Sequence, residues 1–333
     1  MFSRARALVA GYPELAAVLA AAAIGLAAAP PLRWLAGHQG INVALAVLVL
    51  ATALTISPAA LGRIAGAWRS LAVALAAGTC ALPALSWAVA QIAPAGPLRD
   101  GVATVGLAPC EIASVATTAM AGGDAALSAG VLIASTLTTV VLAGPILRLE
   151  AGTPAASSAA VSPGGIIASL ALVVALPLAA GIGLRARVAR VARLERPAGR
   201  AALVTVALLV ALIAAEVRLS AQYVAVGTAL VSFCLGSAAL GWVLGLRSGR
   251  PARTALLLTT SMRDFAIAAG LATAAFGPAA AAPLGLYGVV VLVWGTAAAG
   301  YLRALGARQP QGQQHGKGGE ADGPPERDVE RVS

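Results

Sequence analysis

Apolar residues occupy this chain in long runs, separated by short segments rich in arginine, glycine and proline. About ten runs reach the roughly 20 residues that an α-helix needs to cross about 30 Å of hydrocarbon. They lie near residues 13–31, 40–57, 70–94, 101–120, 124–147, 164–184, 201–217, 221–246, 254–276 and 281–302. The pattern predicts an all-α, polytopic membrane protein with about ten transmembrane helices.

The composition strengthens this prediction. Hydrophobic residues make up 59% of the 333 positions and charged residues only 11%, and the mean hydropathy is +0.87. A soluble domain of this size cannot bury so much apolar surface, so membrane lipid must cover much of it. The many alanines and the 37 glycines allow helix backbones to approach closely in a bilayer.

Basic residues are distributed unevenly between the two faces that alternating spans create. Of the 23 basic residues, one lies within a span and four fall on the face opposite the N-terminus, namely Arg33, Arg99, Arg148 and Arg218. Because cytoplasmic loops carry the excess of Lys and Arg, both termini are expected in the cytoplasm. The near absence of lysine hints at a GC-rich bacterial genome, and so at a bacterial inner membrane.

The two ends of the chain carry separate expectations. The first run follows Arg4 and Arg6 and resembles a secretory signal peptide, but it is long for a signal core, and we favour its retention as a helix. The segment 305–333 is rich in Gly, Pro and charge and poor in apolar residues. It is expected to be a disordered cytoplasmic tail.

Several function classes are disfavoured by what the chain lacks. The three cysteines lie inside apolar runs without a CxxC pattern, and only two histidines occur. A buried metal centre or a His-based intramembrane enzyme therefore has almost no residues to use, and no enzyme is expected. The net charge of +10 forms no continuous basic face, which argues against nucleic acid as a partner.

The chain also shows a layout that occurs twice. Pro109–Glu111 interrupts one span and Arg263–Asp264 interrupts another, and a glycine turn follows each, at Gly123 and at Gly277, 154 positions apart. Five helices per half would insert the halves in opposite orientations. We therefore predict two inverted five-helix repeats with broken helices 4 and 9, an architecture in which unwound backbone can coordinate a solute.

Charged residues inside the spans concentrate at these interruptions. Of thirteen acidic residues, only Glu111 and Asp264 lie well inside spans, and Arg263 accompanies them. Such residues usually mark a pathway, although Arg263 pairing with either carboxylate to hold two helices together is the structural alternative. Two stripes of polar side chains are expected either to line a polar cavity beside these charges or to hydrogen-bond to the backbone of their own helices. These stripes are Glu111, Ser114 and Thr118, and Ser128, Ser135 and Thr139.

From about residue 12 to 304 the sequence resembles the bile acid:sodium symporter superfamily. The resemblance rests on LTISPAALGRI (54–64), LAPCEIASVATTAMAGGDAALSAGVLIASTL (107–137) and TTSMRDFAIAAGLATAAFGPAAAAP (259–283). It implies a panel and a core of helices with substrate between them, released by alternating access. The corresponding segments are 1–68 (panel helices 1–2), 69–150 (core helices 3–5), 151–162 (linker), 163–220 (panel helices 6–7) and 221–304 (core helices 8–10).

The sequence departs from this family where sodium is bound. The family uses a Ser-Asn pair after the first break, Ser and Thr on the next helix, a Glu-Thr-Gly-Met-Gln stretch at the second break and a Gln in helix 3. Ser114, Ser128 and Met262 remain, whereas Val115, Leu132, Thr259 and Arg263 replace Asn, Thr, Glu and Gln, and no Gln precedes Pro83. A guanidinium about 4 Å from sodium repels it by roughly 4 kcal/mol, about a thousandfold in affinity.

We therefore expect a secondary transporter for a small organic anion in which sodium coupling is lost or weakened. Proton coupling through Glu111 or Asp264, or uncoupled transport, would replace it, and no other cofactor is expected. Arg263 is also a possible anchor for an anionic substrate, because guanidinium binds carboxylate through two parallel hydrogen bonds. The candidate binding residues are Cys110, Glu111, Ser114, Ser128, Thr259, Met262, Arg263 and Asp264.

Two alternatives stay open. The related arsenite efflux permeases carry a Cys thirteen residues before a Gly-Asp pair, the spacing of Cys110 and Gly123 here, although their helix-9 Asn-Phe-Glu is not reproduced around Phe265. A membrane receptor or scaffold is disfavoured, because the loops and tail hold no segment with the composition of a folded signalling domain.

Overall fold

A computed structural model describes residues 13–55, 68–150, 165, 168, 170–188, 193–216 and 220–307. The described residues form helices and no strand, which confirms the all-α prediction. The α-helices are α2 (Pro13–Ala27), α3 (Ala29–Leu35), α4 (Ile41–Ala53), α6 (Trp68–Ala76), α7 (Leu82–Ala90), α8 (Pro97–Thr104), α9 (Ala113–Met120), α10 (Ala125–Glu150), α12 (Leu176–Arg187), α13 (Glu195–Glu216), α14 (Gln222–Leu244), α15 (Arg250–Ser261), α16 (Phe265–Phe276) and α17 (Ala282–Ala307).

Short 3₁₀ and π segments connect several of these helices. They are η1 (Ala36–Gly40), η3 (Ala77–Ala81), η4 (Val105–Leu107), η5 (Ala171–Ala175) and η7 (Pro278–Ala281). Within η1 the backbone is non-helical at His38 and at Gln39, whose φ is 65°. α4 therefore begins a new helix, as the gap between the first two apolar runs predicts.

Six helical stretches in the described residues are long and apolar enough to cross a membrane, and the first of them includes the kink at His38 and Gln39. They are Ala29–Ala53, Trp68–Ala90, Ala125–Leu147, Pro197–Ala215, Gln222–Leu244 and Pro278–Leu305, and Phe265–Phe276 is a shorter apolar helix. The membrane class is thereby confirmed. The count of ten spans and the inverted repeat stay predictions, and most of motif 54–64, the linker 151–162 and residues 308–333 lie outside the described residues.

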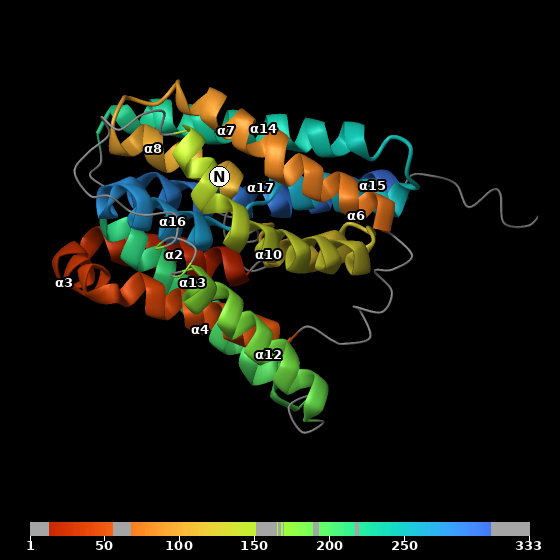
Figure 1. The fold of residues 1–333 in the computed structure, drawn as a ribbon, viewed down its shortest axis with the longest axis horizontal. Helices are drawn as coiled ribbons and strands as arrows, with labels where there is room; N and C mark the ends of the chain where they lie inside the picture. Colours follow the sequence, from red (N-terminus) through yellow and green to blue (C-terminus); the bar gives the residue numbers. More distant parts are fainter. Residues whose placement is uncertain are drawn as a thin grey trace, which may run out of the picture.

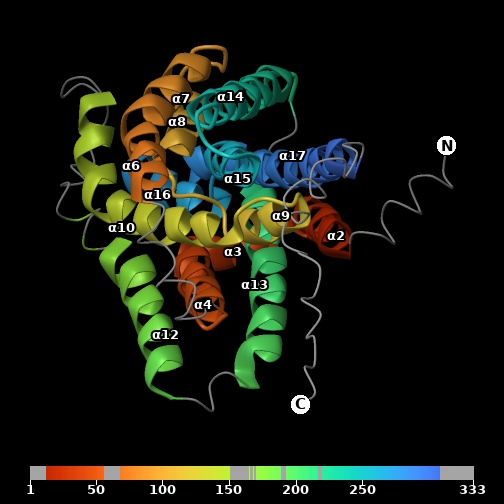
Figure 2. The same cartoon turned by 90° about the vertical axis from the view of Figure 1, so that its right-hand side faces the viewer.

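The helices form two packed groups, visible as separate layers in Figures 1 and 2. We call α2, α4, α12 and α13 the panel, because α13 packs on α2 and α4, and α12 packs on α4. We call α6–α10 and α14–α17 the core, in which α14 packs on α7, α15 and α17, and α16 packs on α8. α4 contacts α16, and α17 contacts α2 and α13, so the panel lies against the core.

Glycine allows one close approach that bears on the first helix. A Cβ on Gly25 of α2 would lie 2.8 Å from the Cβ of Ala214 and 3.0 Å from the Cα of Ala211, both on α13. Glycine is needed for two helix backbones to meet this closely. α2 is therefore an integral part of the panel, and its removal would expose this face of α13.

Both predicted interruptions are present. The first broken helix runs through α8 and η4, unwinds between Ala108 and Ile112, and continues as α9. The second ends as α15 at Ser261, is extended at Met262 and Asp264, and continues as α16. The turns that follow contain Gly122 (φ 72°) and Gly277 (φ 88°), conformations that an L side chain rarely adopts.

Candidate functional site

The two unwound segments cross and pair with each other through their backbones. Cys110 and Arg263 form an isolated antiparallel bridge. The N–H of Glu111 donates to Met262 O and the N–H of Asp264 donates to Pro109 O, each over 2.8 Å. Backbone that leaves the helix at membrane depth needs protein partners, because lipid offers none. Each break therefore supplies hydrogen-bond partners to the other.

Side chains of α10 and α17 satisfy further polar groups of the breaks. The N–H of Cys110 donates to Ser135 Oγ (3.1 Å), and Thr139 donates its hydroxyl proton to Leu107 O (3.1 Å). The N–H of Arg263 donates to the Tyr287 hydroxyl over 3.2 Å. Tyr287 was not among the predicted site residues, because a lone tyrosine in an apolar run carries no pattern that points to a break far away in the sequence.

The two buried carboxylates lie at the N-terminal ends of the second half-helices. Asp264 caps α16, and its Oδ1 accepts the N–H groups of Ala266 and Ile267, both at 2.9 Å. Glu111 Oε1 accepts the N–H of Ile112 at 3.1 Å, before α9 begins. Helix N-termini favour negative charge, so both carboxylates are placed where the backbone stabilises them.

Arg263 does not pair with either carboxylate. Glu111, Arg263 and Asp264 are 5%, 3% and 1% exposed. The Arg263 guanidinium donates from Nη2 to Ala108 O, and its Nε has no partner. Among the described residues no ion pair joins Arg263 to Glu111 or Asp264, and Glu111 Oε2 has no hydrogen-bond partner. The structural alternative of an ion pair that holds the two helices together is therefore absent from this conformation.

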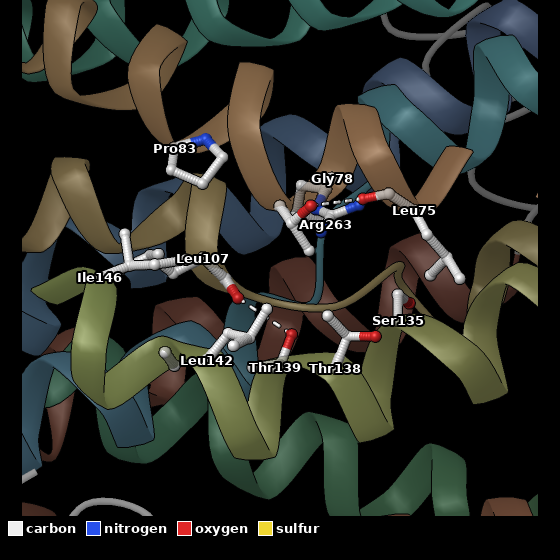
Figure 3. A pocket seen from close by; sticks show the side chains of 12 residues that line it. Leu75, Gly78, Pro83, Leu107, Ser135, Thr138, Thr139, Leu142, Ile146 and Arg263 are labelled. Carbon is white, nitrogen blue, oxygen red and sulfur yellow. Dashed lines mark hydrogen bonds between the residues drawn. The ribbon is translucent and has the colours of Figure 1, made fainter. Parts of the chain in front are cut away.

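Arg263 and Asp264 line different hollows, because successive residues of an extended segment project to opposite sides. The core hollow lies between α6–α7 and α10 (Figure 3) and is lined by Leu75, Gly78, Thr79, Pro83, Leu107, Ser135, Thr138, Thr139, Leu142, Ala143, Ile146 and Arg263. The interface hollow lies between panel and core and is lined by Val49, Thr52, Ile112, Leu132, Thr136, Leu178, Asp264 and Ile267.

The remaining predicted site residues are all buried near the first break or along α15. Ser114 Oγ lies 2.9 Å from Cys110 Sγ, and Thr118 donates to Ser128 Oγ at 3.4 Å. The Thr259 hydroxyl donates to Ala255 O of its own helix, and Met262 is buried between α15 and α16 of the core. The hydroxyls are thus engaged with one another, with the Cys110 thiol or with their own helix. Cys110 is fully buried, and the arsenite permease alternative stays open.

The surroundings of Ser114 and Ser128 do not fit a sodium ion. Leu132 belongs to a buried apolar cluster with Leu127, Val131 and Leu256, and Val115 packs against it. A hard cation needs several oxygen ligands, and Val115 and Leu132, at the positions where the resemblance implies Asn and Thr, have aliphatic side chains that supply none. Within the described residues, no group of three or more His, Cys, Asp or Glu could hold a metal either.

A multi-span helical protein with two broken helices that cross in its interior has the architecture of a membrane transporter. The chain belongs to the Sodium Bile acid symporter family, whose family model matches residues 42–227, more than half of the sequence. It is thus a membrane transporter of the bile acid symporter or arsenite permease type. Members of this family are transporters rather than enzymes. No curated protein matches the chain.

Proposed function

We propose that the protein is a secondary transporter that carries a small organic anion through the interface between panel and core, without sodium coupling. One observation carries the proposal. The interface hollow is lined from both groups of helices, by Val49, Thr52 and Leu178 of the panel and by Leu132 and Asp264 of the core. A site at the border of two rigid groups can open to either side of the membrane when one group moves against the other.

The chemistry of the interface hollow suits a solute with an apolar body and one polar end. Most of its lining side chains are aliphatic. Thr52 Oγ1 is buried and has no hydrogen-bond partner, so it is free to meet a polar group of the solute. The charge of Asp264 is offset by the N-terminus of α16. The anionic class of the solute rests on the family resemblance.

The absence of sodium coupling is supported by two features of the crossing. Val115 and Leu132 stand where the resemblance implies the oxygen ligands Asn and Thr, and a buried guanidinium lies at the second break. Both oppose a bound cation, the first by removing ligands and the second by repulsion. Coupling to protons and uncoupled transport are the modes that remain.

Uptake by proteoliposomes tests the proposal. The purified protein is reconstituted, and a panel of radiolabelled carboxylates, steroid conjugates and arsenite is offered in sodium buffer and in choline buffer of equal ionic strength. We expect uptake of at least one anion above empty vesicles, with equal rates in the two buffers. An imposed pH gradient then separates proton-coupled from uncoupled transport. Strong sodium dependence at neutral pH contradicts the coupling proposal, and uptake of metalloids alone contradicts the substrate class.

A further inference from the structure

Four helix ends meet at the crossing, and three charged side chains lie among them. The N-terminal ends of α9 and α16 face Glu111 and Asp264, as helix dipoles require. The C-terminal ends of η4 and α15 carry partial negative charge and need a cation by the same rule. Arg263 is the only basic side chain among the described residues that line the two hollows.

The guanidinium lies at one of these C-terminal ends. It donates to Ala108 O, the first carbonyl beyond η4, where the backbone has become extended (ψ 151°). That carbonyl has left the helix, so no following N–H of the same helix can satisfy it. Elsewhere at the crossing, backbone N–H groups or hydroxyls donate hydrogen bonds to the carbonyls of the breaks, namely Leu107 O, Pro109 O and Met262 O. Ala108 O differs because its partner is a full positive charge.

Gly78 lies opposite this guanidinium. A Cβ on Gly78 would lie 3.7 Å from Nη2 and 4.0 Å from Nη1 of Arg263, which is ordinary van der Waals contact, so Gly78 borders the guanidinium and a methyl group would also fit there. Gly78 belongs to the π-helical turn η3, which interrupts α6 and α7 next to the core hollow. π-turns of this kind are inserted at functional positions more often than elsewhere.

We propose that Arg263 is a tethered cation, whose guanidinium permanently supplies the positive charge that a free monovalent cation would otherwise have to bring to the half-helix ends of the crossing. The crossing is then assembled without a bound ion. This inference deepens the proposed absence of sodium coupling, and its test measures stability rather than uptake, so either can fail without the other.

The charges nearby distinguish a tethered cation from an anion site. Glu111 and Asp264 place two carboxylates at the same crossing as one guanidinium. A small anion bound beside Arg263 would add a third negative charge in a medium that screens weakly. Removal of the guanidinium, in contrast, leaves two carboxylates and two half-helix C-termini without a cation, which is a site that attracts one.

Thermal unfolding of the purified full-length protein in detergent and choline buffer tests the inference. The variants are Arg263→Lys, Arg263→Gln and Arg263→Gly, with Arg69→Ala as a control that removes an exposed arginine. Each variant is measured alone and with methylguanidinium or sodium. Urea is the uncharged control for a denaturing effect of methylguanidinium. We expect Arg263→Lys to melt near the parent protein and the other two Arg263 variants to melt lower. A cation at about ten times its Kd should then raise their Tm by roughly 2 °C, with no such response in the parent or in Arg69→Ala.

Three results overturn the tethered cation. In the first, Arg263→Gln has the same Tm as the parent and its Tm does not change with added cation, so a neutral donor to Ala108 O is sufficient. In the second, both neutral variants are destabilised but neither cation protects them. In the third, chloride stabilises the parent relative to gluconate, which makes Arg263 an anion site. If neither neutral variant survives purification in choline buffer, the purification is repeated in methylguanidinium buffer. Recovery of folded protein only with methylguanidinium supports the inference, and failure in both buffers contradicts the inference.

Discussion

Arg263 and Asp264 are neighbours in the chain but serve opposite sides of the crossing. Arg263 faces the core hollow, where all other lining residues belong to core helices or to the segments between them. Asp264 faces the interface hollow, where panel and core helices meet. In the proposed transport cycle, in which the panel moves against the core, the surroundings of Arg263 stay the same, whereas those of Asp264 change. Because successive side chains of an extended segment point to opposite sides, Arg263 is kept away from the proposed solute path and Asp264 borders it.

Replacement of Asp264 should have the largest effect, because its carboxylate caps α16 through two hydrogen bonds. We expect Asp264→Ala to lower the free energy of unfolding by about 3 kcal/mol, from the lost cap and from a guanidinium left with less compensating charge. Thermal unfolding in detergent measures this loss. Asp264→Asn keeps an oxygen acceptor and is the matched control. Equal losses in both variants would show that charge rather than capping dominates.

The hydroxyl partners of the two breaks should come next. Ser135→Ala removes the acceptor of Cys110 N–H, and Tyr287→Phe removes the acceptor of Arg263 N–H. A buried N–H without a partner costs about 1–3 kcal/mol, so each variant should unfold earlier by a similar amount. Thr138→Val is the control, because its hydroxyl bonds only its own helix at Ala134 O. If the control is as unstable as Ser135→Ala, the bridging role of Ser135 is refuted.

A bulky side chain in each hollow separates their roles. Thr52→Phe obstructs the interface hollow and should lower uptake on the order of tenfold, equivalent to about 1.4 kcal/mol of lost binding. Thr138→Phe obstructs the core hollow and should leave the uptake rate per folded molecule nearly unchanged. Uptake normalised to the amount of folded protein is the measurement. The reverse order of effects would place the solute path on the side of Arg263.

The smallest effect on stability is expected for Glu111→Gln. The amide oxygen can still accept the N–H of Ile112, and Glu111 Oε2 has no partner to lose. The melting temperature should therefore change by an amount equivalent to less than about 1 kcal/mol. Uptake of the same variant under a pH gradient is informative in either direction: loss of the gradient effect identifies Glu111 as the proton carrier, and persistence excludes it.

Local chemistry made the breaks predictable. Pro109 cannot continue a helix, and Arg263–Asp264 puts two charges into an apolar run, so both interruptions were visible in the sequence. The glycine turns were predictable for a similar reason, because glycine tolerates the positive φ that Gly122 and Gly277 adopt in the structure. The second broken helix appeared as a single run over 254–276, but the structure divides it into α15 and α16 of 12 residues each. Neither half alone reaches the length of a span.

The direction of each charged side chain was not predictable. It depends on the register of the Cys110–Arg263 bridge, and a shift by one residue would exchange the hollows that Arg263 and Asp264 face. The partnership of Arg263 with Ala108 O, rather than with a carboxylate, and the role of Tyr287 follow from the same tertiary register. The π-turn at Ala77–Ala81 left no clear signal either, because no residue type marks it.

The contact between Arg263 and Ala108 joins residues 155 positions apart, and this separation has a consequence for biosynthesis. At about 5–20 residues per second, Arg263 leaves the ribosome roughly 8–30 s after Ala108. Throughout that interval the first unwound segment has no intramolecular partner from the second. Until the second half is inserted, the free backbone groups of the first unwound segment need other hydrogen-bond partners, such as water at the insertion site or a membrane chaperone.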